Sequence, residues 1–364
     1  MRRRAFLAVV AAAPAARALA PHDAPGGIAP ARLRERDALL ARAEAALAAR
    51  KPGEAMPLLE RAAQIAHAPD TELAIVRCRM QAGEYRQALS FAAHAAGAHL
   101  EETAGAGLYA WLLNAGGQPA IAARLLREAQ ARNPQDRLLK AVAAQLERPW
   151  PVASGPLLQA PARMAPYAAP LPGTAVVGSG TLLAGGRVAL VPAALVHRGA
   201  GLWVRNGLGD TVEARVADQP VAGVARLALS QRLPDPQLPA AARDPFPGSV
   251  AMAIEYAPQA AGTPAWPLLR TGFIGAALPV EGERRLGIAL PPRAARGGPV
   301  LDQRGALAGI AIGDAHGDRL VGIGPLRAAL GPGLLPPASA STPVDVDGAY
   351  ELGLRQSLQL LRRA

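Results

Sequence analysis

The stretch that decides the fold is Arg296-Gly297-Gly298-Pro299-Val300-Leu301, followed by Gln303-Arg304-Gly305-Ala306-Leu307-Ala308-Gly309-Ile310. Two adjacent glycines predict a tight loop, and the apolar residues after Pro299 predict a short strand. Gly305 predicts a turn, and a second apolar strand follows it. The stretch therefore indicates a β-rich domain in which a glycine loop leads directly into a hairpin.

Short apolar strands separated by Gly and Pro turns continue on both sides of this hairpin. Examples are Val176–Leu183, Val188–Val191, Val250–Tyr256, Leu269–Gly275 and Leu320–Ile323. Many short strands with such turns are typical of an all-β sandwich or barrel. We therefore expect residues 173–330 to form one β domain.

The order of these segments resembles trypsin-like serine peptidases of the bacterial high-temperature-requirement type. The matching segments are Gly178-Ser179-Gly180, Leu190–Val196, Arg226-Leu227-Ala228-Leu229, Ala251–Ile254, Gly272-Phe273-Ile274 and Ala294–Pro299. In that family a Ser stands directly before Gly-Gly-Pro. The resemblance implies a trypsin-like double β-barrel over residues 173–330.

The same resemblance places the three catalytic positions of the family on residues without the required chemistry. The His position falls on Ala194, the Asp position on Arg226 and the Ser position on Arg296. The mechanism needs a hydroxyl nucleophile, an imidazole that takes its proton and a carboxylate that orients the imidazole. A methyl group cannot accept a proton, and a guanidinium stays protonated. We therefore predict no catalytic residue and a pseudoprotease.

One alternative is an active serine endopeptidase with a displaced triad. His197 lies three residues after Ala194 and is the fallback candidate for the base, and His316 and Ser179 are further candidates. None of the serines lies in the Gly-x-Ser-Gly pattern that aims backbone N–H groups at an oxyanion. A separate hypothesis is that Arg226 and Arg296 together gather an anion such as a carboxylate.

Residues 31–148 have a different composition, rich in Ala, Leu and Arg, with helical periodicity. Gly53, Gly83 and Gly117 each open the second helix of an expected pair, at spacings of 30 and 34 residues. This pattern resembles tetratricopeptide repeats, whose unit is a helix pair of about 34 residues. The resemblance implies an α-solenoid with a groove for a protein or peptide ligand. The alternative is a purely structural stalk that carries the barrel.

The ends and linkers complete the expected organisation. Residues 1–20 combine Arg2-Arg3-Arg4, a short apolar run and small residues, which predicts an export signal peptide cleaved near Ala18 to Ala20. Arg3-Arg4-Ala5-Phe6-Leu7 resembles a twin-arginine motif, and the general secretory route stays open. We expect linkers at 21–30, 149–172 and 331–343. Residues 344–364 form either a C-terminal helix, the simpler interpretation, or a strand added to the barrel.

Composition limits the remaining functions. The formal net charge is +11, but the arginines are dispersed among acidic residues, which argues against a nucleic-acid surface. The single cysteine, Cys78, cannot form an intramolecular disulfide and is expected in the helical core. We predict no cofactor and no metal, and no integral membrane segment after the signal, and we leave the oligomeric state open. The sequence as a whole predicts an exported, catalytically inactive binding or scaffolding protein of the bacterial periplasm or cell envelope.

Overall fold

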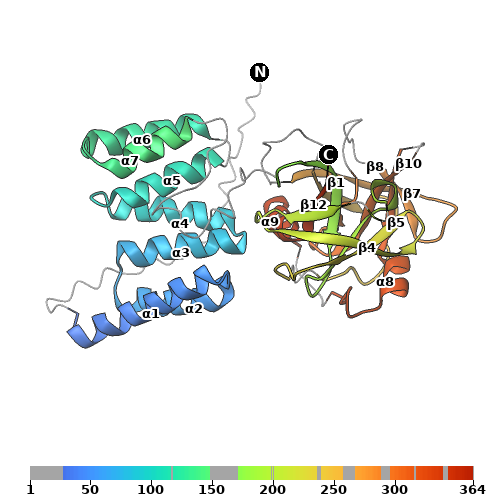
Figure 1. The fold of residues 1–364 in the computed structure, drawn as a ribbon, viewed down its shortest axis with the longest axis horizontal. Coiled ribbons are helices and arrows are strands. Elements are labelled where there is room, and N and C mark those ends of the chain that lie inside the picture. Colours follow the sequence, from blue (N-terminus) through green and yellow to red (C-terminus); the bar gives the residue numbers. More distant parts are fainter. Residues whose placement is uncertain are drawn as a thin grey trace, which may run out of the picture.

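The structure is a computed structural model that describes residues 28–115, 118–147, 171–197, 199, 201–235, 239–256, 267–287, 296–314, 317–338 and 343–363. A helical array lies beside two β-barrels (Figure 1). The predicted signal peptide, residues 21–27 of the first linker and residues 149–170 of the second lie outside the described residues. The expected fold class, a helical region followed by a trypsin-like double β-barrel, is confirmed.

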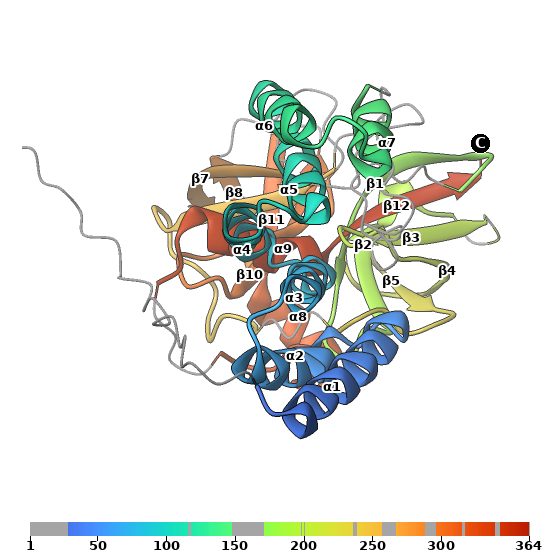
Figure 2. The same cartoon turned by 90° about the vertical axis from the view of Figure 1, so that its left-hand side faces the viewer.

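The helical array consists of antiparallel neighbours stacked in chain order (Figure 2). Proline stands in the first turn of α1, α2, α3 and α6, where its missing N–H has no partner to lose. The Asp136 side chain caps α7 by accepting a hydrogen bond of 2.7 Å from the Leu139 N–H. The helices are α1 (Pro30–Ala48), α2 (Pro52–Ile65), α3 (Pro69–Ala82), α4 (Tyr85–Ala98), α5 (Thr103–Ala115), α6 (Pro119–Arg132) and α7 (Arg137–Leu146).

The array shares its core between successive helix pairs. One cluster joins Met80 of α3, Ala92 of α4, Trp111 of α5 and Leu126 of α6. A second cluster joins α1 and α2 to α3 and contains Cys78, which is buried as expected. Buried alanines let neighbouring helices approach closely, so each pair depends on its neighbours for burial of its apolar face.

The β domain consists of two closed antiparallel barrels. The first has the strand order β1-β12-β3-β4-β5-β2 and the second β10-β11-β8-β7-β6-β9. Each barrel has its own apolar core, with Leu227 and Leu360 in the first and Val300 and Leu320 in the second. The strands are β1 (Thr174–Leu182), β2 (Val188–Pro192), β3 (Leu202–Asn206), β4 (Thr211–Val221), β5 (Val224–Leu229), β6 (Val250–Glu255), β7 (Leu268–Ala277), β8 (Glu283–Gly287), β9 (Pro299–Leu301), β10 (Leu307–Asp314) and β11 (Gly317–Gly322).

The C-terminal residues form both of the elements that were alternatives for them. A helix, α9 (Val346–Gln356), leads into a strand, β12 (Ser357–Arg363), which pairs with β1 on one side and β3 on the other. The interpretation as a plain terminal helix therefore fails for residues 357–363. The first barrel is closed by a strand from the far end of the chain. A further helix, α8 (Ile323–Leu330), follows β11.

Charged contacts join the helical array to the β domain. Arg86 at the start of α4 contacts Asp345, at 3.0 Å, and Glu351 of α9, at 3.4 Å. Arg50, after α1, pairs with the buried Asp210 in the β3–β4 turn. Helix α9 thus contacts the array while its other residues pack on the barrels. In the part of the chain that the structure describes, no helix is both long and apolar enough to span a bilayer.

Candidate functional site

The glycine loop Arg296-Gly297-Gly298 is wedged between the two barrels. Gly297 has φ +116°, and a Cβ there would overlap the Ser179 carbonyl oxygen and the Pro192 ring of the first barrel. A Cβ on Gly298 would lie 2.6 Å from Cγ of Glu255 in the second barrel. The loop therefore requires glycine at both positions, for backbone conformation and for close approach.

Arg296 heads this loop, at the position where the resemblance expects a nucleophile. Its side chain is largely buried and forms an ion pair with Asp318 of β11, through Nε and Oδ1. It lies over Gly313 of β10, where a Cβ would come within 3.3 Å of the arginine Cγ. The guanidinium is thus held against the second barrel by a carboxylate, and it carries no nucleophilic atom.

The expected His position lies in the 3-10 turn η3 (Ala193–Leu195) that follows β2. Ala194 is exposed, whereas the side chain of Leu195 lies against Gly178, next to the Arg296 carbonyl oxygen. The structure therefore places Leu195, and not Ala194, beside the glycine loop. Neither residue can accept a proton, so this difference of one residue leaves the chemical argument unchanged.

The fallback base His197 is exposed beyond the end of this turn. Within the described residues His197 forms no hydrogen bond and no ion pair, so no carboxylate orients its ring. His316, the other imidazole considered, lies outside the described residues. The buried Ser179 hydroxyl donates a hydrogen bond to the Tyr256 carbonyl oxygen (3.2 Å) and accepts one from the Tyr256 N–H (2.8 Å). That serine links β1 to the end of β6.

Arg226, at the expected Asp position, lies on β5 opposite Leu190 of β2. It is half-buried and pairs with Asp218 of the neighbouring β4. Arg226 and Arg296 thus each have an aspartate from an adjacent strand. The hypothesis that the two arginines jointly gather an external anion loses its main support, because both charges already have internal partners.

Glu255, at the end of β6, is a site residue that the sequence analysis did not single out. It is 1% exposed. Burial raises the pKa of its carboxyl from 4.5 to about 7, while the charges of Arg296 and Arg270 act in the opposite direction. The sequence signal for this site was that Glu255 is the lone carboxylate in the apolar run Val250–Tyr256. Carboxylates are rarely fully buried without partners.

Taken together, the space between the barrels holds a compact charged cluster formed by Arg296, Asp318, Glu255 and Arg270. Glu255 is a titratable group, but the described residues around it supply no imidazole. The nearby hydroxyls of Ser179, Thr181 and Ser357 each donate a hydrogen bond to a backbone carbonyl oxygen. Peptide-bond hydrolysis by the serine mechanism requires both a hydroxyl nucleophile and an imidazole. The arrangement can hold charge and exchange a proton at Glu255.

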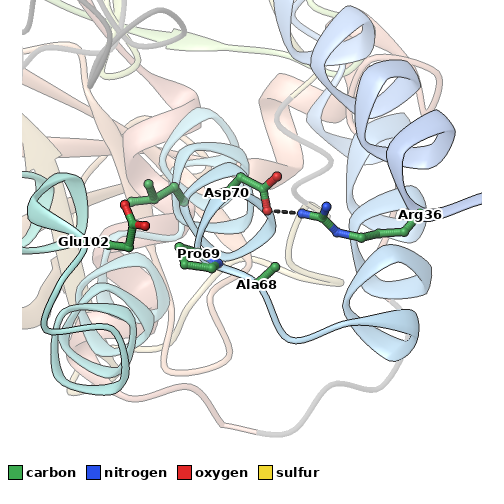
Figure 3. A pocket seen from close by; sticks show the side chains of 6 residues that line it. Arg36, Ala68, Pro69, Asp70 and Glu102 are labelled. Atoms are coloured by element: carbon green, nitrogen blue, oxygen red, sulfur yellow. Dashed lines mark hydrogen bonds and ion pairs between the residues drawn. The ribbon is translucent and has the colours of Figure 1, made fainter. Parts of the chain in front are cut away.

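The helical array carries an open pocket of about 390 Å³ (Figure 3). It is lined by Arg36 of α1, by Ala68, Pro69, Asp70 and Leu73 around the start of α3, and by Glu102 before α5. Arg36 reaches across and pairs with Asp70. Both charge signs and an apolar side chain therefore border the same hollow.

Of the three comparisons with known proteins, the one with solved structures gives matches. No family model matches the chain, and no curated protein matches it. Among solved structures, the inactive form of the protease Rv3671c matches 43% of this chain and 86% of its own, at 18% identity and a TM-score of 0.34. An inactive serine-to-alanine mutant of Rv3671c from M. tuberculosis H37Rv matches 44% and 85%, at 20% identity and a TM-score of 0.34. These similarities concern the fold alone.

Proposed function

We propose that the protein is a catalytically inactive homologue of trypsin-like serine peptidases that binds and scaffolds other proteins in the cell envelope. The observation that carries the proposal is the position of Arg296 and its ion pair. It stands directly before Gly-Gly-Pro, where the family has its nucleophile, and its side chain is committed to Asp318.

The neighbouring positions support the same conclusion. Leu195, beside the glycine loop, and the exposed Ala194 offer no proton acceptor, and Arg226 pairs with Asp218 instead of orienting an imidazole. A single substitution would leave room for partial activity, but the losses remove the nucleophile, the base and the orienting acid. The barrels retain their packing around a site that cannot perform the family's acyl transfer.

The helical array supplies the binding role in this proposal. Stacked antiparallel helix pairs with glycines at intervals of 30 and 34 residues fit tetratricopeptide-like repeats. Repeats of this kind present extended surfaces for peptides and partner proteins. The pocket lined by Arg36, Leu73 and Glu102 is our candidate for part of that surface. Helix α9 contacts both the helical array and the barrels, so a shift of the array on ligand binding would reach the barrels through α9.

Export is the remaining component. Residues 1–20 carry the order of a signal peptide, and we propose that the mature protein begins near Ala18 to Ala20 and acts in the periplasm or at the envelope. Fractionation of cells producing the full chain, with mass spectrometry of its N-terminus, tests this part. Recovery of the uncleaved chain from the cytoplasm alone would contradict it.

The binding role is tested by affinity capture of the full chain from envelope extracts. We expect one or a few partners at near-stoichiometric amounts, lost in Glu102→Arg, which reverses a charge in the pocket. Glu101→Arg is the matched control, because Glu101 is exposed, adjacent and outside the pocket lining. Capture that is equal in both variants would contradict the pocket, and absence of any partner would favour the structural stalk.

A further inference from the structure

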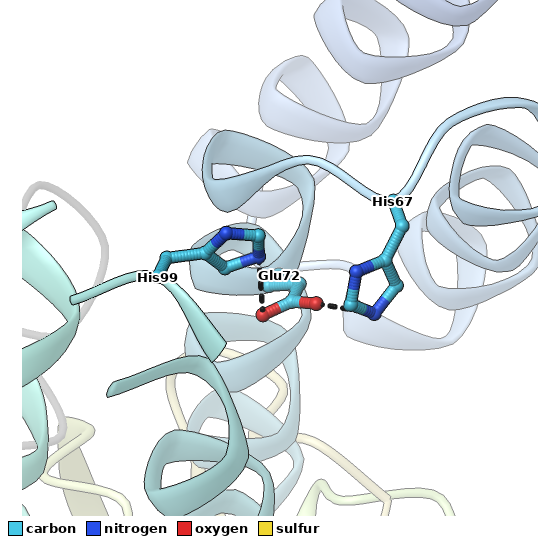
Figure 4. Close-up of side chains that lie close together, drawn as sticks. All are labelled: His67, Glu72 and His99. Atoms are coloured by element: carbon cyan, nitrogen blue, oxygen red, sulfur yellow. Dashed lines mark ion pairs between the residues drawn. The ribbon is translucent and has the colours of Figure 1, made fainter. Parts of the chain in front are cut away.

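The imidazoles of His67 and His99 flank the buried Glu72 in the helical array (Figure 4). Glu72 lies in the first turn of α3, and its side chain is 2% exposed. Three of the six histidines of the chain lie around it: His67 before α3, His94 within α4 and His99 at the end of α4. We propose that His67, Glu72, His94 and His99 form a binding site for a divalent transition-metal ion such as zinc.

The distances fit a common central ion. The Glu72 carboxylate lies 2.6 Å from Nε2 of His67, 3.6 Å from Nε2 of His94 and 3.4 Å from Nε2 of His99. The Nε2 atoms of His67 and His94 are 3.4 Å apart. Ligand atoms about 2.0 to 2.1 Å from a tetrahedral zinc ion are separated from one another by about 3.3 Å. The observed separations scatter around that value.

Buried polar atoms of the cluster that lack a hydrogen bond also favour a bound ion. Within the described residues, both carboxylate oxygens of Glu72 and Nε2 of His99 are buried without a hydrogen bond of acceptable geometry. A buried carboxylate without compensation is costly. A divalent cation would satisfy all three atoms at once. The rings are close enough to converge, with centroids of His67 5.4 Å from His94 and 5.6 Å from His99.

The donor set selects the class of metal. Three imidazole nitrogens and one carboxylate oxygen suit zinc, copper or nickel, whereas calcium and magnesium prefer oxygen ligands throughout. Cys78, buried in the array core, donates its thiol to the Pro52 carbonyl oxygen (3.3 Å) and is not part of the set. The ligand atoms of His67, Glu72 and His99 all lie within 4.8 Å of one another, so these three residues would form the core of the site, with His94 as the fourth candidate ligand.

The ligands come from two successive helix pairs, so the ion would connect them. His67 lies between α2 and α3, while His94 and His99 belong to the end of α4. The same two loops continue into Ala68 and Glu102, which line the open pocket. A bound ion would therefore fix the loops that border this pocket. The inference concerns the helical array and does not depend on the inactivity of the barrels.

The test is zinc binding to the full chain, produced without a polyhistidine tag and stripped with a chelator. Titration calorimetry with zinc chloride is expected to show one equivalent bound, with affinity at least about 100-fold weaker in the double variant His67→Ala, His99→Ala. Glu72→Gln keeps the side-chain shape and is also expected to weaken binding. His197→Ala is the matched control, because His197 is exposed and lies outside the cluster.

Cobalt substitution gives a readout that a merely structural change would not produce. We expect the intense visible d–d absorption of tetrahedral cobalt in the wild type and in His197→Ala, and its loss in the double variant His67→Ala, His99→Ala with the helical circular dichroism retained. Absence of stoichiometric zinc binding by the wild type would overturn the proposal. Equal zinc binding by the wild type and the double variant would overturn it as well.

Discussion

Each half of the molecule buries a glutamate, and the surroundings of the two carboxylates differ. Glu255, between the barrels, has the guanidinium groups of Arg296 and Arg270 as its charged neighbours. Glu72, in the helical array, is surrounded by three imidazoles. Guanidinium groups bring their own positive charge and cannot bind a metal, whereas imidazoles are neutral metal ligands near pH 7. The first carboxylate has positively charged groups of the protein as neighbours, and the second is suited to an external cation.

This contrast separates the region where the two barrels meet at a tight glycine loop from a region that brings metal-ligating side chains together. The two barrels pack so tightly around this loop that positions 297 and 298 require glycine. The charged groups around it form pairs within the protein. The following predictions test the glycine loop and the charged groups beside it, and then the core next to the metal cluster, from the largest expected effect to the smallest.

Gly297→Ala is expected to produce the largest effect. At φ +116° a side chain is strained, and its Cβ would overlap the Ser179 carbonyl oxygen and Pro192. We expect the free energy of unfolding of the barrels to fall by about 4 kcal/mol in chemical denaturation. Gly53→Ala in α2 is the control, because no atom lies within 4 Å of its Cβ position. Equal stability of the two variants would contradict the wedged loop.

Asp318→Asn removes the partner of a largely buried arginine. The two side chains are 16% and 12% exposed, so Arg296 would keep its charge without full compensation. We expect a loss of about 3 kcal/mol in unfolding free energy. Asp218→Asn is the matched comparison, because its pair with Arg226 is more exposed, and we expect less than about 1 kcal/mol there. If the order of the two losses were reversed, the assignment of the buried pair would be wrong.

Glu255 predicts a pH dependence of stability. Its folded-state pKa of about 7 lies above its ordinary value of 4.5, so the folded protein holds this proton more tightly than the unfolded chain. The contribution is present in full below pH 4.5 and is lost as the pH rises to about 7, by roughly 2 to 3 kcal/mol. Denaturation of the wild type and Glu255→Gln at pH 5 and pH 8 measures it. The variant is expected to lose less stability over this range, and parallel curves would contradict the buried titrating carboxyl.

Substitution of Cys78 is expected to produce the smallest effect. It also tests whether the apolar core beside the metal cluster takes part in metal binding. Burial raises the pKa of its thiol to about 12, so we expect no reaction with Ellman's reagent at pH 8 in the native protein. Cys78→Ala is expected to cost about 1 kcal/mol through lost packing and to leave zinc binding unchanged. Zinc binding that depends on Cys78 would contradict the proposed ligand set.

The sequence allowed the two-part fold to be predicted because its signals are local. Apolar runs between glycine and proline turns indicated the barrel strands, and helical periodicity indicated the array. The role of β12 could not be decided, because pairing of Leu358 with Gly180 and Asn206 joins residues far apart in the chain. The one-residue difference between Ala194 and Leu195 depends on how η3 turns, which spacing does not fix.

The clusters were harder to predict, since each assembles from several elements. Arg296 and Asp318 meet because Arg296 lies over Gly313 of β10, which pairs with Asp318 of β11, and Glu255 joins them from β6. No metal site was predicted from the sequence. His67 and His99 are 32 residues apart, nearly one repeat, and therefore occupy equivalent loops of successive helix pairs. This spacing is the sequence signal from which the proximity of His67 and His99 could have been predicted.

The central claim, that the barrels lack a serine nucleophile and its base, is tested most directly with a fluorophosphonate probe. The native full chain is incubated with the probe beside active trypsin, and its intact mass is then measured. We predict no mass increase for this protein under conditions that label trypsin completely. Stoichiometric labelling of one serine, abolished by prior heat denaturation, would contradict the account and show that a displaced catalytic site exists.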